Sequence, residues 1–385
     1  MRKCNPVLHD LAGEVRNRVV KNEIGNNPQG IATVARELIP RISDVELVEL
    51  VAQLSHEHVG LGPLSQIVQI PQVTDVIVNG HSDIWIDRGQ GLERINSPWQ
   101  SEADLRLFAT QLAVANFRRL DELNPYVDIQ TRSGLRCHIV TPPLSCSGTQ
   151  ISLRIPNRSR PSLDVLLEGQ AVELLPFLQA ILTAKQSVMI CGGTGSGKTT
   201  LLAALLREVS STERIVVIED SLELSIDHPH VVNLQSRLPN SEGVGEVAMR
   251  TLVRQALRMR PDRIVIGEIR GAEIIELFAA LNTGHLGSAT TIHANSAPDV
   301  ITRVQLLGAM YGLNDEAVHQ QLASTIDIVI GLTNDKGKRI ISEIGGLHLV
   351  NDRCQYFPFI VTQPWFVITD YGQQFLKSLE PLTCE

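Results

Sequence analysis

The sequence predicts an α/β fold in which a core of parallel strands follows a smaller α+β N-terminal domain. Three observations lead to this prediction. After about residue 170, short apolar segments alternate with helical segments, as in parallel sheets that are covered on both faces. One apolar segment runs directly into a glycine-rich loop and a helix at Gly192 to Thr200. Before residue 155, strand candidates surround one helix and a tight turn, which is typical of an α+β domain.

Length and composition allow two or three globular domains. The chain has 385 residues, 43% hydrophobic and 4% aromatic, with 34 basic against 42 acidic side chains and a net charge of -8. This balance counts against a protein that coats nucleic acid by bulk charge, although a local basic patch stays open. The six cysteines are scattered without a C-x-x-C pair, so we expect reduced thiols and no structural zinc. No apolar run has the length of a membrane span or a signal peptide, so we expect a cytoplasmic protein.

Changes of pattern along the chain divide it into five segments. A polar stretch rich in proline and arginine follows residue 155 and is typical of a linker. The aromatic residues near the C-terminus follow the last α/β strand, and we expect them to pack onto the core rather than to form a docking surface. The expected segments are a helical region at 1–60, an α+β domain at 61–155, a linker at 156–170, an α/β domain with the glycine-rich loop at 171–350 and a C-terminal tail at 351–385.

Three local patterns predict elements in the first half of the chain. In "DVELVELVAQL" the apolar residues recur on one face, which predicts an amphipathic helix. The runs "TDVIVNG" and "SDIWID" predict two strands joined by a hairpin or a tight connection. A helix is expected from Ser101 to Leu120, with Ser101 and Asp104 as its capping box.

The segment "GGTGSGKTT" fits the phosphate-binding pattern G-x-x-x-x-G-K-[ST] between an apolar strand and a helix. Glycines let backbone N–H groups turn toward phosphates, and the helix N-terminus adds a favourable dipole. We expect Lys198 to meet the β- and γ-phosphates of ATP and Thr199 to hold Mg²⁺. The ATP-binding candidates in this loop are Gly192, Gly193, Thr194, Gly195, Ser196, Gly197, Lys198, Thr199 and Thr200.

Two glutamates follow apolar strands, where a parallel sheet presents its chemistry. Glu219 follows "RIVVI" and Glu268 follows "RIVIG". Phosphoryl transfer needs one acid to orient water and another to position Mg²⁺, directly or through water, so Glu219 is a candidate for the metal as well as for catalysis. The pattern leaves open which glutamate is the base. His285 and His293 bracket one strand candidate, and for each the choice between a core histidine and a γ-phosphate ligand stays open.

The chain resembles the type II/IV secretion-system ATPases, nearest to those of tight-adherence (Tad/Flp) pilus assembly, over about residues 45 to 350. The resemblance runs through "GLGPL", "TDVIVNG", "GGTGSGKTTLL", "RIVVIEDSLEL", "RIVIGEIRG" and "TGHLGSATTIHANS". It implies a RecA-like P-loop ATPase core, a hexameric ring and an N-terminal domain that lies over the nucleotide.

The same resemblance implies roles for individual residues. Glu268, Glu219 and His293 become the catalytic candidates. The matching positions are Glu219 and Glu223 in the Asp box, Glu268 as the Walker B glutamate, His285 and His293 in the His box, and Arg136 and Arg154 as the arginines that reach the phosphates from the N-terminal domain.

The expected function is Mg-dependent ATP hydrolysis by a homo-hexameric motor that powers pilus assembly or protein secretion. The resemblance implies an inner-membrane platform protein as partner and a place at the inner face of the cell membrane, with no transmembrane segment. One alternative is a RecA-like motor that translocates nucleic acid, as in conjugation. The net charge of -8 and the few aromatics count against it, so we expect no specific nucleic acid. A second alternative is a nucleotide switch without hydrolysis, which the presence of Lys198, Glu219 and Glu268 disfavours.

Overall fold

The chain forms two compact units. The computed structural model describes residues 28–38, 42, 47, 61–89, 91–116, 118–131, 134–156, 161–237, 239, 243–335, 338–362 and 365–379. The first unit comprises Met1–Asn157 with Asn240–Val244, and the second comprises Arg158–Pro239 with Gly245–Glu385. Most of the expected helix in "DVELVELVAQL" lies outside the described residues.

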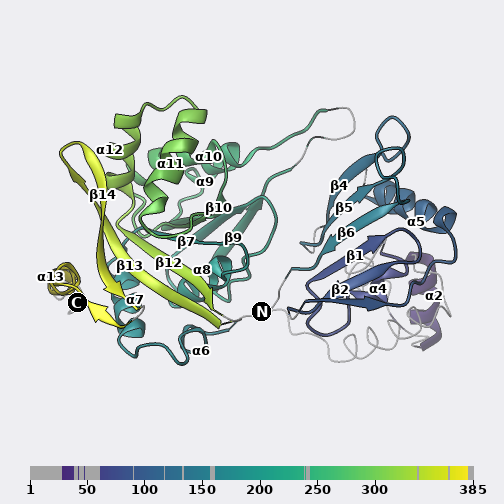
Figure 1. Cartoon of the computed structure of the whole chain (residues 1–385), viewed down its shortest axis with the longest axis horizontal. Coiled ribbons are helices and arrows are strands. Elements are labelled where there is room, and N and C mark those ends of the chain that lie inside the picture. Colours follow the sequence, from purple (N-terminus) through teal and green to yellow (C-terminus); the bar gives the residue numbers. More distant parts are fainter. Residues whose placement is uncertain are drawn as a thin grey trace. The chain divides into compact units, whose positions relative to one another are not determined.

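The first unit contains a six-stranded antiparallel sheet in the order β3-β2-β1-β6-β5-β4 (Figure 1). Residues along its strands alternate between buried and more exposed positions, so one face packs on helices and the other stays polar. The elements are α2 (Pro28–Leu38), α4 (Leu64–Ile67), β1 (Asp75–Asn79), β2 (Ile84–Asp87), β3 (Leu92–Ile95), α5 (Glu102–Ala115), β4 (Tyr126–Gln130), β5 (Arg136–Val140) and β6 (Gln150–Arg154).

Two local predictions for this unit can be compared with its contacts. The hairpin is confirmed, because β1 and β2 pair antiparallel and the amide of Asn79 donates to the carbonyl of Asp83 at 2.8 Å. The cap is also confirmed, since Oγ of Ser101 accepts from the amide of Asp104 at 3.2 Å. The helix, however, ends at Ala115 and not at Leu120. Asn116 ends it, because its side-chain amide donates to the carbonyl of Leu112 at 2.9 Å, a local bond that competes with further helical turns.

The second unit is built on a nine-stranded sheet in the order β15-β14-β13-β12-β7-β11-β10-β8-β9 (Figure 1). The strands from β12 to β9 run parallel, and β13, β14 and β15 extend the sheet in antiparallel fashion. The elements are α6 (Leu163–Leu166), α7 (Leu174–Thr183), β7 (Val188–Gly192), α8 (Lys198–Arg207), β8 (Ile215–Glu219), β9 (Val231–Gln235), α9 (Met249–Ala256), β10 (Arg263–Ile269), α10 (Glu273–Leu281), β11 (Ala289–Ile292), α11 (Asp299–Met310), α12 (Asp315–Thr325), β12 (Ile328–Asp335), β13 (Lys338–Val350), β14 (Arg353–Val361), β15 (Val367–Ile368) and α13 (Asp370–Leu379).

Helices cover both faces of the parallel strands, as the apolar runs predict. Alternate strand residues enter two separate cores: Val265 of β10 packs in the core of α7 and α8, and its neighbours Ile264 and Ile266 pack in the core of α9 to α12. The predicted α/β class with a smaller α+β unit before it is therefore confirmed. The α8 face matters most for function, because α8 begins directly after the glycine-rich loop.

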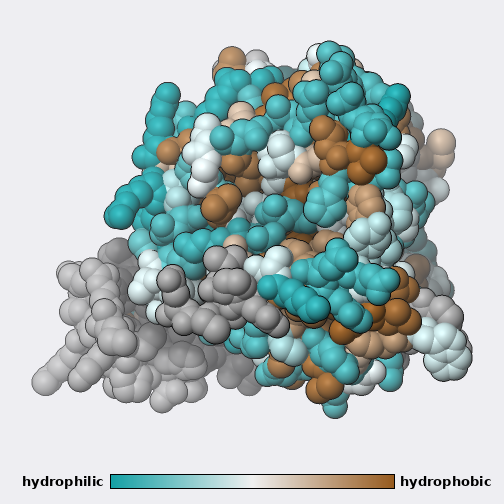
Figure 2. All heavy atoms as spheres, turned by 90° about the vertical axis from the view of Figure 1, so that its left-hand side faces the viewer, coloured by the Kyte–Doolittle hydropathy of each residue, from teal (hydrophilic) through white to brown (hydrophobic). Residues whose placement is uncertain are grey.

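Most of the aromatic residues after residue 350 belong to this sheet and its covering helix. β14 pairs with β13 along its length, and Phe359 of β14 stacks on Phe375 of α13 with ring centroids 4.6 Å apart. Trp365 and Tyr371 are instead 79% and 51% exposed. In Figure 2, hydrophobic residues on this side of the molecule show as separate patches among hydrophilic ones. Within the described residues, no helix is both long and apolar enough to cross a membrane.

Candidate active site

Two glycines give the phosphate-binding loop its shape. At Gly192, which ends β7, a Cβ atom would come within 2.6 Å of the Leu332 carbonyl oxygen and of Oγ of Ser196. Gly197 has φ 96° and immediately precedes α8, and a Cβ there would lie 2.5 Å from Cδ of Arg339. Both positions therefore require glycine.

Lys198, the first residue of α8, points back into this loop. Its Nζ donates to the carbonyls of Gly192 and Gly193, each at 3.0 Å, and lies 3.3 Å from Nδ1 of His293. The side chain is only 7% exposed. Burial lowers the pKa of the Lys198 ammonium below its usual value, and the nearby carboxylate of Glu268 acts in the opposite direction.

Other residues of the loop fit the phosphates of ATP. Ser196 is 3% exposed, and its Oγ has no hydrogen-bond partner among the described residues. A buried hydroxyl normally needs a partner, and a phosphate oxygen bound in the loop would supply one. The hydroxyl of Thr200 instead accepts from Nη1 of Arg339 at 3.3 Å, which leaves Thr199 as the threonine suited to Mg²⁺.

A β-bulge directs Glu268 toward the loop. Ile266 pairs with Thr290 and Ile269 with Ile292, so β10 has one residue more than β11 between these pairs. The extra residue disrupts the alternation that would have placed Glu268 on the face of Ile264 and Ile266. Bulges beside active sites commonly redirect a side chain in this way.

Glu268 then joins His293, Lys198 and Arg270 in one chain of contacts. Its Oε1 lies 2.8 Å from Nε2 of His293, and its Oε2 pairs with the guanidinium of Arg270. Burial lowers the pKa of His293, an effect that Glu268 opposes and that Lys198 and Arg270 reinforce. The structure thus brings together three of the residues predicted for catalysis and phosphate binding.

Glu219 takes a different position. It is 3% exposed, and its Oε1 accepts from the backbone amides of Glu223 at 3.1 Å and Leu224 at 3.0 Å. Its Cγ lies so close to Gly267 that a Cβ there would be 2.8 Å away. Glu219 therefore fixes the loop that follows β8, and its assignment to catalysis or to the metal stays a prediction.

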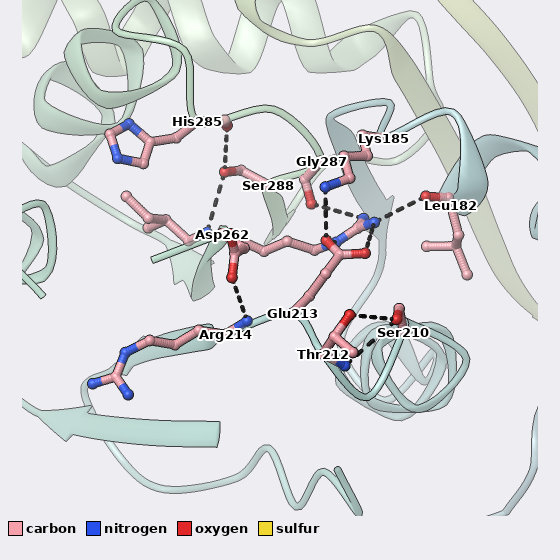
Figure 3. Close-up of polar contacts among 12 residues, drawn as sticks. Leu182, Lys185, Ser210, Thr212, Glu213, Arg214, Asp262, His285, Gly287 and Ser288 are labelled. Atoms are coloured by element: carbon pink, nitrogen blue, oxygen red, sulfur yellow. Dashed lines mark hydrogen bonds and ion pairs between the residues drawn. The ribbon is translucent and has the colours of Figure 1, made fainter. Parts of the chain in front are cut away.

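His285 and His293 lie at opposite ends of β11 (Ala289–Ile292). His285 precedes β11, at the end where Ala289 pairs with Val188, the first residue of β7, whereas the phosphate loop follows the last residue of β7. Its Nδ1 lies 3.2 Å from the Ala280 carbonyl. Figure 3 shows its ring pointing away from Glu213 and Lys185, which form an ion pair at this end of the strands. The two histidines therefore cannot contact one phosphate within one chain.

Arg136 and Arg154 are direct cross-strand partners on β5 and β6 of the first unit. Arg154 is 60% exposed and lies 3.6 Å from Oδ1 of Asp75. Both side chains thus lie on one row of the sheet. A role for them at the phosphates stays a prediction.

A shallow, partly open pocket lies beside the phosphate loop. Its apolar walls come from α6, α8, β12 and β13, and its polar groups are Gln170 and Arg339. Sequence reasoning missed both residues because each lies in a polar segment that resembles a solvated turn. The lining residues are Leu166, Leu167, Gln170, Ser196, Gly197, Leu201, Leu332, Arg339 and Ile341.

The family match and similar relatives of this chain point to the same protein family. Residues 57–344 match the family described as "Type II/IV secretion system protein". A Mycobacterium tuberculosis (strain H37Rv) protein, named "Putative conjugal transfer protein", is 43% identical over 323 residues, 82% of this chain and 92% of that protein. The type IV secretion system protein VirB11 of Brucella suis is 30% identical over 319 residues, 74% of this chain and 88% of that protein.

Two solved structures share the fold. The ATPase DotB of Legionella pneumophila matches with a TM-score of 0.53 and 21% identity, over 76% of this chain and 81% of that one. The pilus retraction motor PilT with bound ADP matches with a TM-score of 0.52 and 20% identity, over 84% and 87%. Because the family match covers most of the chain, including the phosphate loop and Glu268, this protein is an ATPase of the type II/IV secretion system family.

Proposed function

We propose that this ATPase is the motor of a conjugation-type or type IV secretion machine and that it works as a homo-hexamer against an inner-membrane partner, at the inner face of the membrane. The observation that supports this most is the 43% identity to a protein named for conjugal transfer, over 92% of that protein. The narrower pilus-assembly hypothesis, drawn from the likeness to tight-adherence ATPases, has less support, because the relatives above are named for conjugal transfer and type IV secretion.

For the chemistry we propose one role for each residue of the assembled site. Lys198 binds the β- and γ-phosphates, and Glu268 orients the attacking water and accepts its proton as the bond from the γ-phosphorus to ADP breaks. Thr199 is the residue that would hold Mg²⁺, which would neutralise phosphate charge.

Arg136 and Arg154 are proposed to add positive charge at the γ-phosphate from the first unit. ATP carries about four negative charges, and Lys198 with Mg²⁺ neutralises only part of them. Arg154→Ala should then lower kcat strongly while circular dichroism shows an unchanged fold. If kcat stays within about twofold of wild type, the arginines are structural, as exposed strand residues often are.

Purified full-length chain should hydrolyse ATP, and Lys198→Ala should abolish turnover because the phosphate charge loses its charge-assisted hydrogen bonds. Wild-type turnover in that variant would disprove the site. The transported substrate is addressed by repeating the assay with single- and double-stranded DNA. With a net charge of -8, we expect no stimulation at physiological salt. Strong stimulation with a steep salt dependence would instead identify a motor that acts directly on nucleic acid.

A further inference from the structure

All three donors of the Lys198 ammonium are used within the protein. They point to the carbonyl oxygens of Gly192 and Gly193 and to Nδ1 of His293. An ammonium group has three N–H groups and no acceptor. Phosphate oxygens that bind Lys198 must therefore compete with these three partners.

The contact with Lys198 favours one tautomer of His293. Because the ammonium can only donate, Nδ1 of His293 is the acceptor in this contact. In the neutral ring the proton is then on Nε2, which donates to Oε1 of Glu268 at 2.8 Å. The lowered pKa of His293 agrees with a neutral imidazole. A directed chain of hydrogen bonds thus runs from Lys198 through His293 to Glu268.

Glu268 is restrained at both of its oxygens in this arrangement. Oε1 accepts from His293 and Oε2 pairs with Arg270. Each donor occupies a position at the carboxylate that a water molecule would otherwise take. A carboxylate that is to accept a proton from water must therefore lose at least one of these donors.

We propose that His293 is a positioning residue that couples the occupancy of the phosphate loop to the release of Glu268. When Lys198 turns to the γ-phosphate of ATP, Nδ1 of His293 loses its donor, and the imidazole is free to move away from Oε1 of Glu268. The carboxylate then becomes available to water only when ATP is bound. This inference rests on the proposed function of the site, because it assumes that Lys198 binds the γ-phosphate and that Glu268 is the base.

The test compares His293→Ala and His293→Gln in the full-length chain, with His285→Gln as the matched control at the other edge of the sheet. Binding of inorganic pyrophosphate is measured by calorimetry, and kcat and KM for ATP are measured separately. In the alanine variant, pyrophosphate should bind about threefold to tenfold more tightly, because Lys198 no longer has to leave an imidazole. Its kcat should stay within about twofold of wild type, because Glu268 no longer has to be released from the imidazole.

The glutamine variant separates coupling from a merely structural role. Its side-chain oxygen can accept from Lys198 and its N–H can donate to Glu268, so pyrophosphate affinity and kcat should stay near wild type. The proposal is overturned if the alanine variant binds pyrophosphate no more tightly, or if its kcat falls by about tenfold or more. It is also overturned if the glutamine variant binds pyrophosphate as tightly as the alanine variant does. If the alanine variant does not fold, the glutamine variant decides alone, and a loss of either property there overturns the proposal. A wild-type chain without turnover would refute the proposed function instead, while the pyrophosphate comparison would still test the contact between Lys198 and His293.

Discussion

Charged side chains form a cluster at each end of the second unit's parallel strands, and the two clusters differ in their exposure to solvent. At the edge where the strands end, Glu268 is 18% exposed and its partners His293 and Arg270 are 39% and 51% exposed. At the edge where the strands begin, Arg263 is 2% exposed. Its guanidinium donates to both carboxylate oxygens of Glu213 and to the carbonyls of Leu182 and Gly287, three residues shown together in Figure 3.

The contacts of Arg263 are therefore permanent, whereas those of Lys198 and Glu268 can be replaced by contacts with a ligand. Arg263 has protein partners on every side, so its bonds hold the start of β10 to neighbouring segments and leave no place for a ligand. The bonds of Lys198 and Glu268 are of similar kinds, but they adjoin the open loop at Gly193, where phosphate oxygens can replace them. The position of charges relative to solvent, rather than their number, therefore indicates which edge is the active site.

The largest expected effect on stability is that of Arg263→Ala. Removing this residue leaves Glu213 charged and without its main partner in a largely buried site, so the free energy of unfolding should fall by about 3 to 5 kcal/mol. Urea denaturation measures the change, and Arg258→Ala, at an exposed arginine, should stay within about 0.5 kcal/mol of wild type. A loss below about 1 kcal/mol for Arg263→Ala would contradict the permanent role of this cluster.

Glu268→Gln should change activity strongly and stability little, the opposite of Arg263→Ala. The amide keeps the shape of the side chain and can still contact His293, so unfolding should change little and ATP should still bind. Without a carboxylate to accept the proton, kcat should fall at least about a hundredfold. Glu208→Gln, at an exposed residue after α8, is the control and should keep full turnover. Normal turnover per bound ATP in Glu268→Gln would mean that Glu268 is structural.

Acid should weaken the Arg263 cluster through Glu213. Burial alone would raise the pKa of Glu213, but the hydrogen bond and charge of Arg263, with Lys185, outweigh burial and hold it below the usual 4.5. A lowered folded-state pKa means that this stabilisation is complete above about pH 4.5 and is lost as pH falls through the folded-state value. Unfolding free energies measured from pH 7 down to pH 3 should therefore fall less steeply for Glu213→Gln than for wild type. Parallel curves would show that the ion pair does not contribute.

The smallest effect is expected for His285→Ala. This histidine contacts Thr283 and the Ala280 carbonyl, far along β11 from the phosphate loop. Its removal should leave kcat and KM for ATP within about twofold and stability within about 1 kcal/mol. Kinetics and thermal unfolding on the same preparation test both statements. A large loss of kcat with an unchanged fold would mean that the edge where the strands begin takes part in the reaction.

Much of the fold could be predicted from local sequence patterns. The parallel strands are apolar because both of their faces are buried, and this signal is present in runs such as "IVVIE". The phosphate loop was found because its glycines and lysine have fixed spacing. The extension by β13 and β14 was not predicted, because long antiparallel strands with mixed polarity resemble a tail when their pairing partners are unknown.

The residues of the candidate site could be named from the sequence, but the contacts between them could not. Glu268 and His293 stood out as polar residues near strand ends, yet their contact depends on a bulge that no spacing rule shows. His285 and His293 looked equivalent in sequence, and only the direction of β11 separates them. The role of Arg263 was not predicted, because its burial depends on contacts with Glu213 and Gly287, which are distant in sequence.

The bulge at Gly267 and Glu268 has a consequence for how such an enzyme can change. A single-residue deletion at this point would restore regular pairing between β10 and β11 and remove the extra residue that sets the position of Glu268 relative to His293. The phosphate loop lies on β7 and α8, so we expect such a variant to keep ATP binding and to lose turnover. A short series of deletions through β10, assayed separately for ATP binding and for turnover, would test this expectation.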